Sequence, residues 1–465
     1  MLTPPDAAAS PAASDAASPD AASPASASPG TPAHGSPCPR CRAALTDDPR
    51  FLAWCPACDW NLAPGADAAP APTRRERAAA DRTDRLFQEQ AAGGATPTAR
   101  RDWLLASAAA GVIHLVTVGT FALALWLLIA GTVVQRCIGA VVLVIAVALR
   151  PRLGRVPKDE NVLDRAGAPA LYGLADRVAA EVGARPVDVI QVTDEFNASY
   201  GLVGLRRRSV LRIGLQLWEV LDDRQRVALL GHEFGHHVNG DRRRSFWLYS
   251  AISALRAWYQ MTRPGHDGYV TGRDEVSLLV RLGTALGRLV LRGVAWLLHQ
   301  GLVLFDRLTS RAGQQAEYHA DTLAVRVAGG EAARGMLTAL LHGSSVATAV
   351  HRVRAEERGR PRVVRSRNRR AEDAPAPAAP ELLWARVREQ LATVPATERE
   401  RLLRLSARDR SAVDGSHPPT QLRIALAERA ANQEAAVTAT AAEAGAIAVE
   451  LAPHRARIAV ELLAG

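Results

Sequence analysis

The stretch LLGHEFGHHVNGD, residues 229–241, determines how the rest of this chain is interpreted. Asp222 and Asp223 precede it and can cap the first turn of a helix, and apolar residues follow them at helical spacing. Asn239 and Gly240 are typical of the point where such a helix ends. We therefore expect a helix that carries three histidines and a glutamate close to its C-terminal end.

These polar residues have the spacing of a metal site. His232 and His236 lie one helical turn apart on the same face, and Glu233, next to the first histidine, is rotated from it by about 100°. Two imidazoles in this arrangement can share one Zn²⁺, while the carboxylate reaches the attacking water without becoming a ligand. The chain has 12 histidines in 465 residues, so about 0.015 HExxH matches are expected by chance. A solvated helix that merely carries histidines is the alternative.

A catalytic zinc site needs a third protein ligand, and the segment SRAGQQAEYHADTLAV, residues 310–325, supplies one. Glu317 is the candidate ligand. Asp321, one turn later, can accept a hydrogen bond from the far nitrogen of a ligand histidine. The same helix carries small residues that permit another helix to approach closely, namely Ala316, Ala320 and Ala324. The alternative is that both acidic residues are surface charges of an amphipathic helix.

HEFGHHVNGD followed by SRxxxxxEYxAD resembles the M48 metallopeptidases, the family of the HtpX and CAAX prenyl proteases. This resemblance covers about residues 160–350 and 384–430. It implies a mainly α fold with a small β-sheet (α+β), of the zincin-like gluzincin type. It also implies that His232, His236 and Glu317 bind Zn²⁺ and that Glu233 is the catalytic base of a zinc metalloendopeptidase.

Two flanking stretches are also similar to that family. NASYGLVGLRRRSVLRIGLQLWEVLDD, residues 197–223, resembles its Asn-Ala segment, and SHPPTQLRIALAE, residues 416–428, resembles its late His-Pro-Pro…Arg motif. A developing oxyanion needs a hydrogen-bond donor besides the metal, and Asn197 and His417 are the candidates. A turn residue and a histidine at a helix N-terminus are the respective alternatives.

Within the first of these stretches, SVLRIGLQLW, residues 209–218, alternates apolar and polar residues and predicts a β-strand. A free edge at this strand could hold an extended peptide by main-chain pairing. A buried central strand fits the same pattern.

The N-terminal region combines low complexity with a cysteine motif. Residues 1–37 are rich in Ala, Ser, Pro and Asp, lack the features of a secretory signal peptide, and are expected to be disordered. Two C-P-x-C pairs follow, and their spacing predicts a Cys₄ zinc ribbon with one structural Zn²⁺. Two disulfides are the alternative. The four cysteines are Cys38, Cys41, Cys55 and Cys58.

A nearly uncharged region, residues 103–150, is long enough for two membrane spans, placed near 104–128 and 132–149. Arginines flank both ends, so the positive-inside rule predicts that both ends face the cytoplasm. We therefore expect a multi-pass protein of the cell membrane whose ribbon and peptidase domain face the cytoplasm. A helical hairpin buried in a large protein is the alternative.

A second apolar region, residues 276–305, carries one polar stripe formed by Arg281, Arg288, Arg292 and His299. This pattern favours a helix that lies in the membrane interface, and a re-entrant element or a helix packed on the peptidase core remains possible. The net charge of +10 could indicate nucleic-acid binding. Attraction to a membrane surface accounts for the arginines as well, so nucleic acid is not an expected partner.

The expected protein is thus a membrane-anchored zinc endopeptidase with protein or peptide substrates, membrane or misfolded proteins in particular. The alternatives are an inactive membrane scaffold and a zinc-ribbon membrane regulator that binds protein or nucleic acid. The sequence does not predict an oligomeric state. The expected divisions are an arm (1–37), the ribbon (38–62), a linker (63–102), two transmembrane helices (103–150), the peptidase domain (151–352), a disordered basic linker (353–381) and a C-terminal helical part with a tail (382–465).

Overall fold

The computed structural model divides the chain into two compact units, residues 1–62 and 63–465, and each is described by itself. Most of the predicted arm, most of the predicted basic linker and His417 lie outside the residues that the structure describes. The structure describes residues 35–46, 48–64, 73–93, 100–151, 154–238, 242–262, 278–359, 380–408 and 418–464.

The second unit is mainly helical and contains one small mixed sheet, as the sequence predicts. Its strand order is β1-β2-β4-β3, with β2 and β4 parallel and the other pairs antiparallel. The strands are β1 (Val162–Leu163), β2 (Val189–Thr193), β3 (Ala198–Val203) and β4 (Arg208–Gly214).

The strand predicted at 209–218 is therefore the central strand β4, and residues Leu215–Trp218 form the short helix α5 instead. This strand was expected to be either a free edge or a buried central strand, and the second is correct, because Val210 and Leu211 are fully buried. The edge strands are β1 and β3, and β3 pairs with β4 through a register that matches Ala198 with Ile213.

Two helices pack against this sheet and form the hydrophobic core. Helix α4 (Pro169–Val182) and helix α6 (Asp223–Val238) contribute buried Leu, Val and Ala side chains to one cluster with the strands. Tyr200 of β3 meets Phe234 of α6 edge to face at 4.9 Å between ring centroids. Since α6 carries the HExxH residues, this core fixes the helix relative to the edge strand.

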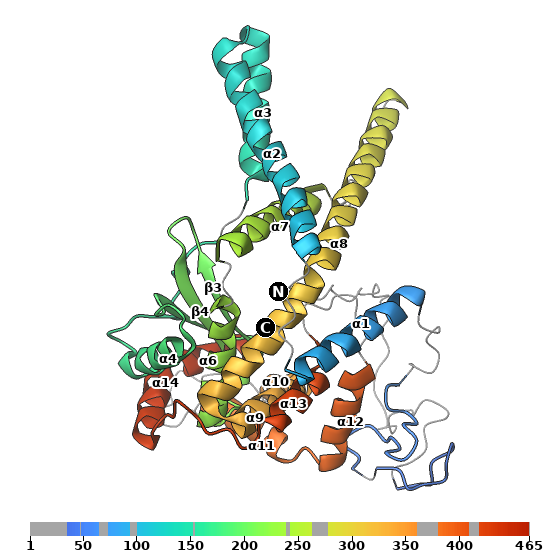
Figure 1. Ribbon diagram of the computed structural model, residues 1–465, viewed down its shortest axis with the longest axis vertical. Coiled ribbons are helices and arrows are strands. Elements are labelled where there is room, and N and C mark those ends of the chain that lie inside the picture. Colours follow the sequence, from blue (N-terminus) through green and yellow to red (C-terminus); the bar gives the residue numbers. More distant parts are fainter. Residues whose placement is uncertain are drawn as a thin grey trace, which may run out of the picture. The chain divides into compact units, whose positions relative to one another are not determined.

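Helix α2 (Arg100–Ala130) and helix α3 (Val133–Leu149) form an antiparallel hairpin, and both expose many apolar side chains (Figure 1). Among the described residues, two helices are long and apolar enough to cross a membrane, namely 101–130 and 285–328, while α3 is a shorter apolar helix. This is consistent with membrane anchoring. Helices α2 and α3 coincide with the spans expected near 104–128 and 132–149.

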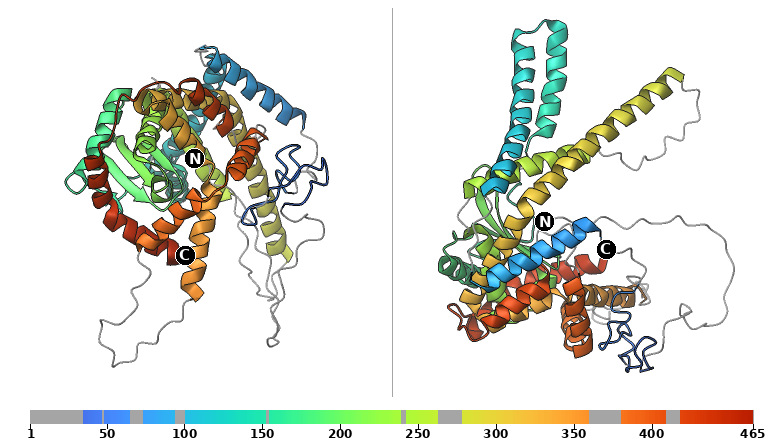
Figure 2. Two further views of the ribbon diagram at one scale, coloured as in Figure 1. Left: turned by 90° about the horizontal axis from the view of Figure 1, so that it is seen from below. Right: turned by 45° about the vertical axis from the view of Figure 1, so that its right-hand side comes forward.

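The long helix α8 (Leu278–Ala328) connects the second apolar region to the candidate third ligand without a break. Its N-terminal half exposes apolar residues such as Leu289 and Trp296, whereas Glu317 and Asp321 in its C-terminal half are buried. Helix α7 (Arg242–Thr262) packs across α2 and α8 (Figure 2). Of the predicted polar stripe, Arg288 and Arg292 are exposed, His299 contacts the ring of Tyr259, and the Arg281 side chain is not among those described.

The remaining helices close the second unit. Glu450 in the last helix accepts hydrogen bonds from the backbone N–H groups of Ala170 and Leu171, so it caps the start of α4. The predicted tail is therefore part of the packed core. These helices are α1 (Arg74–Ala91), α9 (Gly330–Leu340), α10 (Gly343–Gly359), α11 (Pro380–Ala392), α12 (Ala396–Arg408), α13 (Thr420–Arg429) and α14 (Ala441–Ala464).

Candidate metal centre

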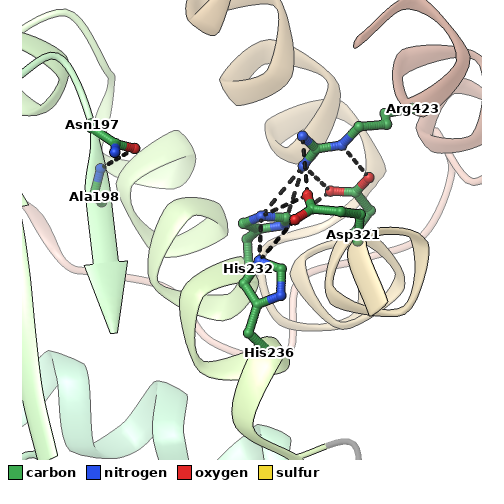
Figure 3. Close-up of polar contacts among 7 residues, drawn as sticks. Asn197, Ala198, His232, His236, Asp321 and Arg423 are labelled. Carbon is green, nitrogen blue, oxygen red and sulfur yellow. Dashed lines mark hydrogen bonds and ion pairs between the residues drawn. The ribbon is translucent and has the colours of Figure 1, made fainter. Parts of the chain in front are cut away.

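Helix α6 presents two imidazoles from consecutive turns. His232 is buried, His236 is half-buried, and their Nε2 atoms lie 3.2 Å apart (Figure 3). The opposite side of the helix is held by buried Val227, Leu230 and Phe234. The amphipathic pattern of residues 223–238 thus orients both histidines toward α8.

Helices α6 and α8 approach each other through small residues, as the alanines of α8 predict. A Cβ atom at Gly235 would lie 2.9 Å from the Cα of Ala320, and one at Gly231 would lie 3.2 Å from the Cα of Ala324. At 2.9 Å a Cβ at position 235 would displace the backbone of α8, and at 3.2 Å one at position 231 would make a tight contact with it. This close contact lets a carboxylate on α8 reach the two histidines on α6.

Glu317 is the carboxylate that reaches them. Its Oε2 lies 3.6 Å from His232 Nε2, and its Oε1 lies 3.5 Å from His236 Nε2. In a tetrahedral zinc site with bonds of about 2.0–2.1 Å, neighbouring donor atoms are about 3.3–3.4 Å apart. The three donor atoms lie within 4.8 Å of one another and have the chemistry that zinc prefers. The residues therefore fit a Zn²⁺ ion with one position left for water.

Behind the donors lies a buried charge network that fixes their orientation. Asp321 Oδ1 lies 3.0 Å from His232 Nδ1, so it can accept that N–H and leave Nε2 for the metal. Arg423 of α13 donates to both oxygens of Asp321, from Nη2 at 2.7 Å and from Nε at 2.8 Å (Figure 3). Its Nη1 lies 3.3 Å from Glu317 Oε2.

Arg423 was not predicted as a site residue. It is part of the SHPPTQLRIALAE segment, but nothing in the sequence shows which side chain of that segment enters the site. The signal is a single arginine within an otherwise apolar helix face, beside buried Leu422 and Ile424. An arginine buried to 4% exposure needs an anionic partner, and Asp321 is that partner.

The site also shifts the pKa values of its carboxyl groups in opposite directions. Burial raises the pKa of Glu233 to about 7, with a further increase from the charge of Glu317, and the charge of His232 opposes both. Burial also acts to raise the pKa of Asp321, but the charge and hydrogen bonds of Arg423 outweigh it and hold this pKa far below its usual range. Asp321 thus stays ionised, whereas Glu233 can gain and lose a proton near neutral pH.

Of the other predicted residues, Asn197 lies outside this cluster, Glu233 lies beside His232 on α6, and His417 is not among the described residues. Asn197 stands at the start of β3, apart from the histidines, and its Oδ1 accepts a hydrogen bond from the N–H of Ala198 at 2.9 Å (Figure 3). His237 faces away from the cluster and packs edge to face on Tyr200 at 4.6 Å. The structure therefore brings together His232, His236, Glu317 and Asp321.

The first unit contains a second cluster of possible ligands. The four cysteines are free thiols whose sulfur atoms lie close enough to hold one metal ion. Cys38 and Cys58 have their Sγ atoms 3.7 Å apart, and Cys41 and Cys55 are separated by 3.5 Å. In a tetrahedral site with Zn–S bonds of about 2.3 Å, neighbouring sulfurs are about 3.8 Å apart.

The two cysteine pairs lie in matching turns. The N–H of Cys38 donates to Ala43 O, and the N–H of Cys55 donates to Trp60 O. Backbone N–H groups near Cys38 lower the pKa of its thiol to about 7 against the effect of burial, whereas burial and the neighbouring thiols raise the pKa of Cys58 to about 12. A lowered pKa favours the thiolate that a metal binds.

Comparison with protein families matches residues 169–431 to peptidase family M48. Comparison with curated proteins and with solved structures finds no match. The matched segment is more than half of the chain, and it contains all three side chains of the His232–His236–Glu317 cluster. We conclude that the protein belongs to peptidase family M48 and is a zinc-dependent endopeptidase.

Proposed function

We propose that this peptidase is anchored in the cell membrane, faces the cytoplasm, and hydrolyses proteins at the membrane surface, including membrane and misfolded proteins. The catalytic part of this proposal rests on the position and the raised pKa of Glu233. Glu233 follows the ligand His232 on α6, is not one of the three donors, and has a pKa that burial raises to about 7.

His232, His236 and Glu317 would hold the zinc ion, with Asp321 fixing the tautomer of His232. When bound there, Zn²⁺ lowers the pKa of water and polarises a carbonyl group. Glu233 takes a proton from the attacking water and later delivers it to the leaving amine. Its carboxyl group suits both steps because it lies beside the ligand His232 on α6 and can accept and then donate a proton.

The edge strand β3 is the proposed binding surface for the peptide. Among the described residues it pairs with β4 alone, and helix α6 lies beside it. An extended peptide that pairs with the main chain of β3 would be held with little dependence on its side chains. Asn197, at the start of β3, and His417 remain the proposed donors to the developing oxyanion.

The four-cysteine cluster supports a second, structural Zn²⁺ in the first unit.

The proposed orientation of the α2–α3 hairpin in the membrane rests on charge. Arg101 lies in the first turn of α2, and Arg150 and Arg155 follow α3, so both ends of the hairpin would face the cytoplasm.

Glu233→Gln tests the catalytic proposal in purified protein with an unfolded substrate. We expect zinc content to stay the same and cleavage to fall by about 10²- to 10⁴-fold, because the amide cannot take the proton. The matched control is Glu389→Gln, which makes the same change at an exposed surface glutamate. Unchanged cleavage in Glu233→Gln would disprove the role of this residue.

A further inference from the structure

The turn between β3 and β4 places an apolar side chain in solvent among arginines. The strands end at the pair Val203–Arg208, and the N–H of Arg207 donates to Gly204 O at 3.1 Å to close the turn. Both of these residues have positive φ, 68° at Gly204 and 51° at Arg207. Leu205 is 88% exposed at the tip.

Two contacts hold this turn beside the apolar helices. The guanidinium of Arg207 lies 5.3 Å from the ring centroid of Phe246 in the first turns of α7. Gly154 lies against Val203, since a Cβ at Gly154 would be 3.2 Å from Val203 Cγ1. Gly154 follows the last residue of α3, Leu149, by a segment that can extend at most about 18 Å. The turn is therefore close to the base of the α2–α3 hairpin.

Helix α7 crosses the base of that hairpin and contacts both of its helices. Near one end of α7, Trp247 Nε1 donates to Ser107 O of α2 at 3.2 Å. Near the other end, Trp258 Nε1 donates to Leu149 O at the end of α3 at 2.6 Å. Helix α7 contacts α2 from Ser107 to His114, and from these residues to the hairpin tip at Ala130 α2 rises about 24–35 Å, which is comparable with the ~30 Å hydrocarbon core of a bilayer. A hairpin that spans the membrane thus places α7 at the lipid–water boundary.

The exposed side chains of α7 suit that boundary. Phe246 and Tyr249 are exposed to 36% and 53% on the face of α7 opposite buried Ala251 and Leu255, and Trp247, which borders the buried face beside His114 of α2, is exposed to 42%. Aromatic rings with polar edges concentrate at membrane interfaces, and arginines beside them bind lipid phosphates.

We propose that the β3–β4 turn and the start of α7 form one lipid-binding surface for anionic phospholipids. This interface patch consists of Leu205, Arg206, Arg207, Phe246, Trp247 and Tyr249. Leu205 inserts between headgroups, and the arginines bind phosphate groups. The patch holds the end of the edge strand β3 at the bilayer, so that substrates reach this strand from the membrane surface. The inference rests on the proposed membrane anchoring but needs no catalysis.

A fluorescent probe at position 205 tests the patch in the full-length protein reconstituted into vesicles. The parent protein carries Glu233→Gln, Cys137→Ser and serines at the four ribbon cysteines, and Leu205→Cys adds the labelling site. The matched control places the probe at Glu434→Cys, an exposed position between α13 and α14. Vesicles contain phosphatidylcholine alone or with phosphatidylglycerol, and nitroxide-labelled lipid is the quencher.

We expect quenching of the probe at 205, stronger with phosphatidylglycerol, and none at 434. Each arginine near an anionic surface changes the docking equilibrium by about fivefold, so Arg206→Gln with Arg207→Gln should lower it by about 25-fold. A probe at 205 that stays as accessible to water as the one at 434, in protein that floats with the vesicles, overturns the inference and leaves the anchoring intact. Protein that fails to float contradicts the anchoring as well. Shielding only by an added acidic peptide would assign the patch to substrate and overturn the lipid proposal.

Discussion

Arg423 and Asp321 form a buried ion pair on which the ligand His232 depends. Both side chains are almost inaccessible to solvent, at 5% and 6%, and the guanidinium donates to both carboxylate oxygens. Such a pair adds little net stability over apolar residues, but removing one partner leaves the other buried and uncompensated. The pair is therefore a device for orientation, and its loss should affect both folding and metal binding.

Arg423→Ala should lower the free energy of unfolding by about 3–5 kcal/mol, because it leaves the Asp321 carboxylate buried without a cation. Zinc affinity should fall by about 10- to 100-fold, since Asp321 no longer fixes the ring of His232. Thermal unfolding and competition with a chelator measure the two effects. Arg386→Ala, which removes an exposed ion pair with Glu389, is the control and should change stability by less than about 1 kcal/mol.

The individual ligands were predictable from the sequence, whereas Arg423 was not. His232 and His236 follow from the helical period, and Glu317 follows from the donor that zinc still requires. Arg423 contacts Asp321 across 102 residues of chain, so no local pattern links them. Only the packing of α13 on α8 brings the two together.

At the scale of elements, the approach of α6 to α8 sets the geometry of the metal site. The ligand carboxylate is on one helix and both imidazoles are on the other, so the distance between the helices decides whether three donors meet. Gly235 stands at the tightest point, facing the backbone of Ala320 rather than a flexible side chain. A side chain at this position must therefore move a helix.

Gly235→Ala should destabilise the fold by about 1–3 kcal/mol through overpacking, which is more than the gain in helix propensity can offset. It should also weaken zinc binding, because the added methyl group pushes α6 and α8 apart. Zinc content after dialysis and the melting temperature measure the outcome. Gly173→Ala in α4 is the matched control, because a Cβ there meets nothing within 4 Å and should be neutral or stabilising. A Gly235→Ala protein with normal zinc affinity would show that the helices can separate without loss of the site.

The elements themselves were predictable to different degrees. The amphipathic pattern located α6, and the apolar runs located α2 and α3, because these signals are local. The position of β4 within the sheet was left open, since alternation shows that a strand has two faces and not which strands flank it. That α8 runs without a break from its apolar half to Glu317 was not predicted from the sequence.

At the scale of the whole molecule, the two units carry separate sets of metal ligands. Every donor of the His–His–Glu cluster lies in residues 63–465, and all four cysteines of the other cluster lie in residues 1–62. Loss of one metal should therefore leave the other in place.

The full-length protein should contain about two zinc ions per chain, and Cys38→Ser with Cys55→Ser should contain about one. Cleavage of a soluble unfolded substrate by this variant should stay close to that of the wild type, because no catalytic ligand is altered. Elemental analysis and a peptidase assay measure both quantities. A value near one zinc in the unmodified protein, or a loss of cleavage in the variant, would contradict the independence of the two sites.

The membrane orientation predicts which parts of the chain a reagent can reach from outside the cell. If both ends of the α2–α3 hairpin face the cytoplasm, the connection at Ala130 lies on the outer side. In a Cys137→Ser background, Ala130→Cys should react with a membrane-impermeant maleimide in intact cells, because Ala130 is exposed at the tip of the hairpin. Glu434→Cys should react only after the cells are opened, and the Cys137→Ser parent gives the background from the ribbon thiols. The reverse pattern would place the catalytic unit outside the cytoplasm, and equal labelling of both positions in intact cells would argue against a spanning hairpin.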